Sequence, residues 1–240
     1  MKKIMVAVMT FVMAVSFMAS QESIPKIEKV EIPGMNIKMF KTEVTQELYK
    51  SVMGENPSDC FGRDRPVECV SWYDAIYFCN RLSEMKGKRP VYAVDGETDV
   101  TKWGYTPHKG EDIGGEITQN LHASGFRLPT IEEWQYAAKG GKDYRYAGSD
   151  ELDAVGWYDE NSNDKTHAVA RKKPNGYGLY DMSGNVWEWG WDFYSADYGH
   201  YVCGGSCYTN VDGCEVDSRG CNSPHFRSRY IGFRLVCPSK

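Results

Sequence analysis

Apolar residues recur at helical spacing in three short segments of the chain. Thr45 can cap a helix that turns Leu48, Val52 and Met53 inward and stops near Gly54. A second helix can begin after Ser71 and end by Gly87; its inward positions are Ala75, Phe78, Cys79 and Leu82. Thr130 and Glu133 form a capping box that opens a third helix, with Gly140 and Gly141 closing it.

The rest of the chain lacks a helical period. Residues 29–40 predict strands around a Pro33–Gly34 turn, and residues 95–125, polar and glycine-rich, predict an irregular loop or a short hairpin. After residue 142 short strands and turns alternate, and the last strand is expected from Gly232 to Cys237. The pattern predicts a loop-rich α+β fold with few short helices, in a single domain over residues 27–240.

The N-terminus has the pattern of an export signal. Lys2 and Lys3 precede an apolar run over residues 4–19, which is shorter than the roughly 20 residues that span a bilayer. Residues 1–20 are therefore expected to be a signal peptide and residues 21–26 a linker. Residues 17–20 resemble a lipobox, but Gln21 stands where lipidation needs cysteine. We expect export to the cell surface (outer membrane) or secretion, with a lipid anchor only if the natural protein has Cys at position 21.

Charge and cysteine content exclude some classes of function. The net charge of -5 is spread along the chain, so no basic footprint for nucleic acid is present. Eight cysteines in an exported chain permit disulfides, in any of about 105 pairings. No C-x-x-C pair occurs, which argues against a zinc site.

Five ordered blocks resemble the formylglycine-generating-enzyme (sulfatase-modifying factor) family. They lie at residues 42–58, 66–72, 126–134, 176–189 and in the pair 204–206 with 232–234. The resemblance implies that family's variant of the C-type lectin-like fold. Within these blocks Arg127 and Arg234 stand in apolar, strand-like settings, and buried arginines need carboxylate partners. Glu133, Glu188 and Asp181 are the candidates.

The resemblance also implies a structural calcium ion and a reactive cysteine pair. The calcium ligands would be the side chains of Asp181 and Glu188 with the carbonyls of Gly184 and Val186, all oxygen donors. The positions of the cysteine pair hold Thr209 and Cys214. Because one thiol is missing, we expect no copper site, no catalytic residues and no oxidase activity. A formylglycine-generating cysteine oxidase is the alternative function.

Residues 204–235 resemble the variable region of proteins that retroelements diversify. Invariant frame residues would be Gly204–Ser206, Cys214, Arg219, Pro224, Arg227 and Ile231–Arg234. Mutagenesis of AAY codons cannot produce Lys, Gln, Glu, Met or Trp. Residues 207–230 contain none of these except Glu215, which we place in the frame. Any loop favours Gly, Ser, Asn and Asp, but not the aromatic residues present here.

We call the fifteen candidate contact residues the variable face. They are Tyr208, Thr209, Asn210, Asp212, Gly213, Asp217, Ser218, Gly220, Cys221, Asn222, Ser223, His225, Phe226, Ser228 and Tyr230. Tyr208, Phe226 and Tyr230 are the expected anchors, because aromatic rings dominate binding hot spots. The role of Cys207 stays open, because this position is often Trp in such regions.

These residues predict a ligand-binding protein rather than an enzyme. The partner would be an unknown protein or cell-surface ligand, bound by a monomer. A sugar-binding lectin is disfavoured, since neither Glu-Pro-Asn nor Gln-Pro-Asp occurs in the chain.

Overall fold

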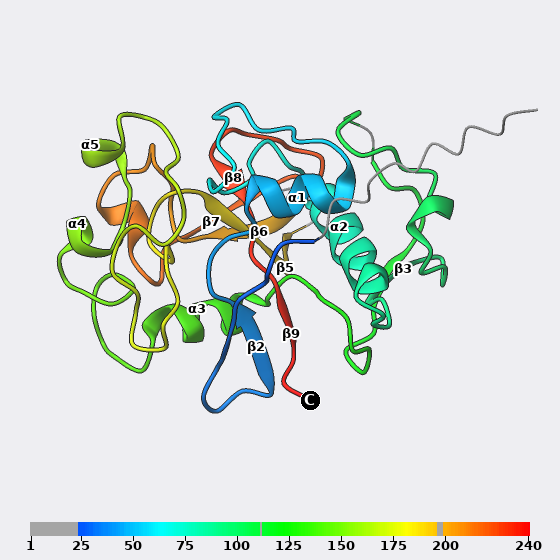
Figure 1. Ribbon diagram of the computed structural model, residues 1–240, viewed down its shortest axis with the longest axis horizontal. Helices are drawn as coiled ribbons and strands as arrows, with labels where there is room; N and C mark the ends of the chain where they lie inside the picture. Colours follow the sequence, from blue (N-terminus) through cyan, green and yellow to red (C-terminus); the bar gives the residue numbers. More distant parts are fainter. Residues whose placement is uncertain (1–23, 111, 196–198) are drawn as a thin grey trace, which may run out of the picture.

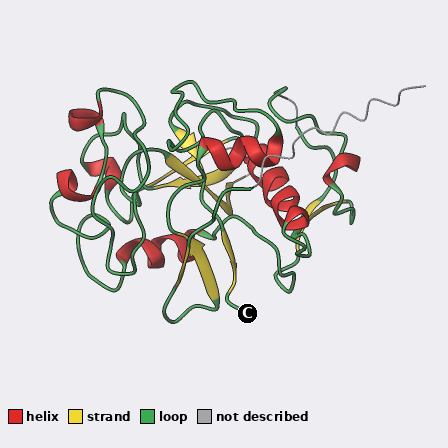
Figure 2. Ribbon diagram, in the orientation of Figure 1, coloured by secondary structure: helices red, strands yellow, loops and turns green. Residues whose placement is uncertain are grey.

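The computed structural model describes residues 24–110, 112–195 and 199–240, so the predicted signal peptide lies outside the described residues. Three helices carry most of the helical structure: α1 (Gln46–Met53), α2 (Trp72–Met85) and α3 (Ile131–Lys139). Single turns form η1 (Val100–Lys102), α4 (Leu152–Val155), α5 (Asp159–Ser162) and η2 (Asp212–Cys214). Loops join these elements across most of the molecule (Figure 2). The loop-rich α+β prediction is confirmed.

The predicted caps fix where the three main helices begin. Thr45 accepts a hydrogen bond from the Leu48 amide, and Thr130 forms a reciprocal capping box with Glu133. Ser71 forms a second capping box with Asp74. Gly54 and Gly140 end α1 and α3 in left-handed conformations, as Cβ-free residues do at low cost. Among the described residues no helix is both long and apolar enough to cross a membrane.

In the described part of the chain, nine short strands form three sheets. Figure 1 shows how they are arranged. β1 (Lys29–Glu31), β2 (Ile37–Phe40) and β9 (Val236–Pro238) form an antiparallel sheet that joins both ends of the domain. β3 (Tyr92–Val94) pairs with β4 (Ile117–Gln119), so the predicted loop at 95–125 closes a hairpin. The third sheet has the order β7-β6-β5-β8, from β5 (Trp187–Ser195), β6 (Gly199–Cys203), β7 (Arg219–Asn222) and β8 (Ile231–Gly232).

The single strand expected from Gly232 to Cys237 was wrong. β8 pairs in parallel with β5, whereas β9 pairs with β2 in another sheet. Between them Arg234 turns toward the buried carboxylate of Glu188. The Phe233 carbonyl accepts a hydrogen bond from the Val44 amide, which belongs to neither of these two sheets. The buried ion pair therefore lies where the chain crosses from one sheet to the other.

Aromatic rings fill the main core between α2 and the third sheet. Tyr49 stacks on Phe78 at 5.2 Å between ring centroids, and Phe233 meets Phe78 edge to face at 5.3 Å. The indole N–H groups of Trp72 and Trp189 donate to the carbonyls of Gly190 and Val70. These contacts hold α2 against β5, and they position the segment that follows β6.

Candidate ligand-binding face

The segment that follows β6 begins in a buried, glycine-dependent turn. Gly205 has a φ of 77°, and a Cβ there would lie 2.6 Å from the Cys214 sulfur. Ser206 is 1% exposed, and its hydroxyl exchanges a hydrogen bond with Thr209 at 2.9 Å. The Gly-Gly-Ser part of the predicted frame therefore packs directly against η2, and only glycine fits at position 205.

Exposure separates the variable face from the frame. None of the fifteen residues of the variable face is buried, and Tyr208 and Phe226 are 58% and 42% exposed. By contrast, Gly204–Ser206, Cys214 and Ile231–Arg234 are all buried. Four frame residues depart from this division, because Arg219 is exposed and Glu215, Pro224 and Arg227 are partly exposed. Cys207, whose role the sequence left open, is buried.

Arg227 ties the second half of the segment to the start of α2. Its Nε donates to Asp74 Oδ2 at 2.9 Å, and its Nη2 donates to Tyr105 at 2.9 Å and to Ser71 at 3.2 Å. Burial raises the pKa of Asp74, but nearby His108, the backbone of Ser71 and Arg227 outweigh it and hold that pKa below its ordinary value. A charged carboxylate with no exposed side-chain surface thus fixes this loop.

Arg145, which lies before α4, is hydrogen-bonded to the first half of the segment. Its guanidinium donates to Glu215 and to Asp212, each at 2.6 Å, and its carbonyl accepts from the Val216 amide at 3.1 Å. Glu215 thus has a positioning contact, as expected of a frame residue. Neither Asp74 nor Arg145 was singled out from the sequence as a site residue. Ser71 with Asp74 three residues later was the one local signal available.

The structure brings two of the three expected anchors together. Tyr208 and Tyr230 stack with centroids 5.0 Å apart and an interplanar angle of 14°. Arg229 lies over Tyr230 at 4.9 Å and also pairs with Asp59. Phe226 makes no ring contact with the described residues, so this exposed ring is available to a partner.

Thr209 and buried Cys214 occupy the two positions of the implied cysteine pair. Cys214 is buried, its thiol lies 3.9 Å from the Thr209 carbonyl, and burial raises its pKa to about 12. Burial likewise raises the pKa of Cys207 to about 12. All eight cysteines are free thiols in the structure. A thiol with so high a pKa supplies little thiolate near neutral pH, and thiolate is the nucleophile and the copper ligand.

A family model for the sulfatase-modifying factor enzyme 1-like domain matches residues 3–238. The chain belongs to this family. Treponema denticola variable protein 1 has a similar structure, with a TM-score of 0.78 and 35% identity, over 89% of this chain and 92% of that one. The expected C-type lectin-like fold and the resemblance to a variable protein are thereby confirmed.

Two curated proteins are also similar to this chain. The chaperone protein LppX of Paenibacillus barcinonensis is 41% identical over 65% of this chain. The formylglycine-generating enzyme of Thermomonospora curvata is 34% identical over 47% of it. The matches span 61% and 50% of these two relatives, so neither whole-protein activity transfers directly.

The calcium site implied by the family resemblance fits the residues only in part. Asp181 Oδ1 is buried without a hydrogen-bond partner, as a metal ligand would be. Both oxygens of Glu188, however, bind Arg234 at 2.6 Å, and Oε2 also accepts from the Trp134 indole at 2.7 Å. No three His, Cys, Asp or Glu residues in the described part could hold a metal. Calcium binding stays a prediction, with Glu188 committed to another partner.

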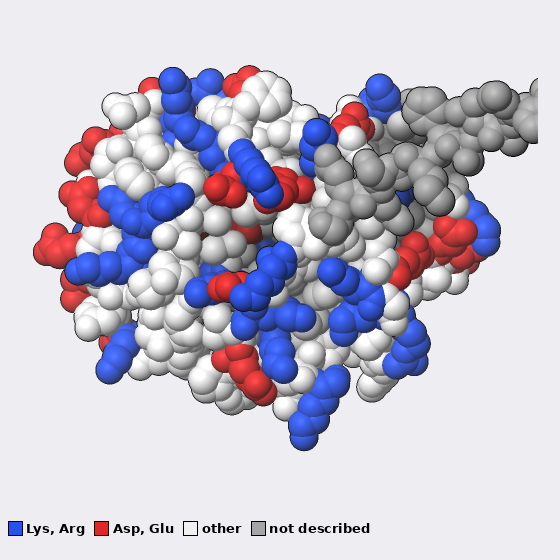
Figure 3. All heavy atoms as spheres, viewed as in Figure 1, with Lys and Arg blue, Asp and Glu red and all other residues white. Residues whose placement is uncertain are grey.

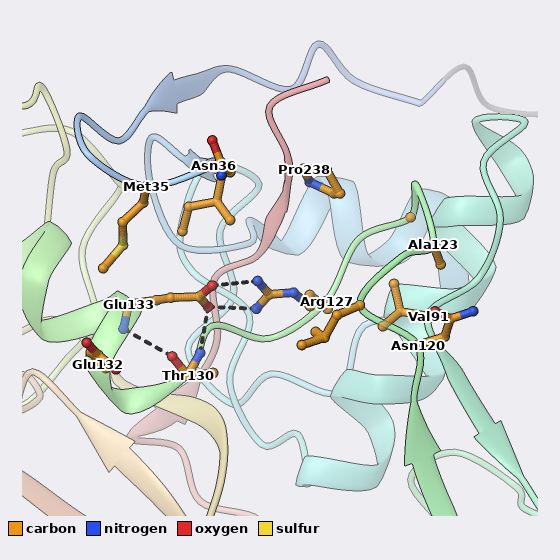
Figure 4. A pocket seen from close by; sticks show the side chains of 13 residues that line it. Met35, Asn36, Val91, Asn120, Ala123, Arg127, Thr130, Glu132, Glu133 and Pro238 are labelled. Atoms are coloured by element: carbon orange, nitrogen blue, oxygen red, sulfur yellow. Dashed lines mark hydrogen bonds and ion pairs between the residues drawn. The ribbon is translucent and has the colours of Figure 1, made fainter.

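A cavity of about 500 Å³ lies away from the variable face (Figure 4). Arg127 and Glu133 pair directly in its wall, with two nitrogen–oxygen distances of 2.6 and 2.5 Å. Glu133 also accepts from the Thr130 amide in the capping box. Of the three candidate carboxylates, Glu133 thus pairs with Arg127 and Glu188 pairs with Arg234. Both pairs neutralise charges at structural positions.

Charged side chains of both signs share the face drawn in Figure 3. Acidic residues gather at one margin, and Lys and Arg are scattered across the middle. This distribution agrees with the spread of charge along the sequence.

Proposed function

We propose that this protein binds a ligand through the variable face and that this face is diversified while the fold stays constant. The single observation that carries the proposal is the division in exposure. All fifteen predicted variable residues reach the surface, and the frame, except for Arg219 and Pro224, is buried or held by charged contacts. Substitution at such exposed positions changes binding without emptying the core.

The proposed partner is a protein on another cell or surface. The aromatic stack of Tyr208 and Tyr230, with exposed Phe226, supplies rigid contact area of the kind used in protein recognition. The name of the LppX relative, a chaperone protein, supports a polypeptide partner. Export, followed by surface display or secretion, fits this role. We expect a monomer that presents one face to its partner. Calcium, if bound, would be structural.

We propose further that the protein does not oxidise cysteine. The missing first thiol at Thr209 and the raised pKa of buried Cys214 support this view. Purified protein loaded with copper is expected to leave a cysteine-containing sulfatase peptide unchanged in a mass-spectrometric assay. Conversion of that cysteine to formylglycine would establish the alternative function.

Sequencing this locus across many cells of the source population tests the main proposal. We expect codon changes confined to the fifteen positions and traceable to adenines of a nearby template repeat. Uniform codons with no template repeat would overturn the proposal. Changes spread evenly over buried frame codons would do so as well.

A further inference from the structure

An aromatic cleft of about 530 Å³ lies at the end of the third sheet, beside the variable face. Its rings come from α2, β5 and β6, and residues just after β7 complete the wall. Figure 1 shows α2 beside this sheet. The lining residues that carry the argument are Trp72, Tyr73, Trp191, Phe193, His200 and Ser223. The volume lies within the roughly 300–1,000 Å³ of small-ligand sites.

The aromatic rings are held in fixed positions. His200 stacks on Trp72 with centroids 3.8 Å apart, and Phe193 meets His200 edge to face at 5.1 Å. Trp72 is anchored by its bond to the Gly190 carbonyl, and His200 Nδ1 by a 2.8 Å bond to the Trp191 carbonyl. Phe193 is 55% exposed, so one ring remains open at the mouth. Such a prearranged cleft loses little side-chain entropy on binding.

The polar atoms argue against an anionic or strongly polar occupant. Asp192 Oδ2 accepts a hydrogen bond from the Ile131 amide, and Ser223 is bonded to His225. The His200 ring stays neutral, because burial lowers its pKa to about 4. No Lys or Arg among the described residues lines the cleft. An anionic ligand would therefore find no countercharge, and a sugar ring would find few polar groups to pair with its hydroxyls.

Two donors remain for a ligand that is mostly apolar. Among the described residues, the Tyr73 hydroxyl and the Trp191 indole N–H make no hydrogen bond. Aromatic rings favour edge-to-face or offset contacts with another ring. We infer that the cleft binds an uncharged aromatic side chain presented by the protein partner, next to the contacts of the variable face. This inference rests on the proposed function for the identity of the partner.

The cleft adjoins the variable face through β7. His200 pairs with Asn222 in the sheet, and Ser223 and Pro224 follow directly as cleft walls. A partner that contacts Asn222 and Ser223 thus reaches the cleft without crossing other structure. The rings of Trp72, Trp191 and Phe193 lie outside the variable segment, so diversification would leave these rings unchanged and would alter the cleft only at its wall residue Ser223.

Titration with p-cresol, a neutral mimic of a tyrosine ring, tests the cleft directly. We expect p-cresol to shift the Trp191 indole N–H signal in nuclear magnetic resonance spectra of the full chain. Ser223→Trp, which fills the mouth, should weaken binding about tenfold or more. Ser218→Trp, the same change elsewhere on the variable face, should leave binding as it is. The anion 4-methylbenzoate and the non-aromatic cyclohexanol should shift the signal far less.

Three outcomes would overturn the inference: no shift with p-cresol, equal binding by Ser223→Trp, or equal shifts with cyclohexanol or 4-methylbenzoate. Loss of binding in Ser223→Trp is interpretable only if that variant melts as Ser218→Trp does. Phe193→Ala, which removes an exposed ring, provides a second variant that should also weaken binding. Failure here would leave the codon-sequencing test of the proposed function untouched.

Discussion

Arg227 shows how one residue can position a loop without touching a ligand. Its guanidinium binds Asp74, Ser71 and Tyr105, and its side chain is 18% exposed. Arg227→Ala leaves the Asp74 carboxylate buried with fewer partners. We expect the free energy of unfolding to fall by about 2–3 kcal/mol, measured by urea denaturation.

Arg229→Ala is the matched control for that substitution. Arg229 is more exposed, and its pair with Asp59 spans 3.7 Å. Its removal should cost less than about 1 kcal/mol. Equal losses in the two variants would show that Arg227 does not anchor the loop.

His200 gives stability a dependence on pH. Burial lowers its pKa in the folded protein to about 4, whereas the unfolded chain takes up the proton near pH 6.5. As pH falls from about 6.5 to 4, the unfolded state therefore binds the extra proton. This group should lower the free energy of unfolding by up to about 3 kcal/mol over that window. His200→Gln should remove this component in urea denaturation at several pH values.

Asp181 acts with the opposite sign. Burial raises its pKa to about 6, so its contribution is lost as pH rises from about 4 to 6. The two residues oppose each other in the native chain. In buffer containing EDTA, Asp181→Asn should make stability rise more steeply with pH, and His200→Gln should make it fall. Parallel pH profiles for the two variants would contradict this account.

Glycines in the frame and in the variable face have different structural roles. Gly205 has a positive φ, and a Cβ would also lie 2.9 Å from the Gly213 carbonyl. At Gly220 φ is not positive, and a Cβ would meet only Val202 at 3.3 Å. Gly205→Ala should therefore destabilise the fold by about 2 kcal/mol or more.

Gly220→Ala should cost less than about 1 kcal/mol, because only one flexible methyl group must move. Thermal melting followed by circular dichroism would measure both variants. A larger loss for Gly220→Ala than for Gly205→Ala would refute the division between frame and variable glycines.

Elements with local signals were predictable from the sequence, and non-local ones were not. Thr45, Ser71 and Thr130 each cap a helix by bonding a residue three positions later. Such short-range signals can be recognised in the sequence alone. The split of residues 232–237 into β8 and β9 depends on Glu188 and Val44, far along the chain. The pattern of apolar and polar residues does not show that these segments contact each other in the fold.

At the scale of the whole molecule the same limit applies to the site. The fifteen residues of the variable face are a prediction from the sequence, because the residue bias and the family frame can be seen there. The stack of Tyr208 on Tyr230 and the anchors Asp74 and Arg145 were not, since they depend on contacts through space. The aromatic cleft was missed for the same reason. It combines α2, β5 and β6, whose adjacency only the fold reveals.

The division of the molecule into a constant scaffold and a replaceable face predicts that many surface changes can be combined. No residue of the variable face belongs to the buried core clusters. A variant changed at six surface positions, five of them exposed and Ser218 partly exposed, tests this point. It carries Tyr208→Ser, Asn210→Ser, Asp217→Asn, Ser218→Asn, His225→Asn and Phe226→Ser. Exposed changes usually fall within about 0.5 kcal/mol each, so the total should stay below about 3 kcal/mol.

A single core substitution gives the comparison. Phe233 is fully buried against Tyr49 and Phe78, and Phe233→Ala should cost about 3–5 kcal/mol. The sixfold variant should therefore unfold at higher urea than Phe233→Ala, although it has lost both exposed aromatic anchors of the face. If instead it unfolds as readily as Phe233→Ala, the variable face is part of the folding core. Diversification at these positions would then be incompatible with a constant fold.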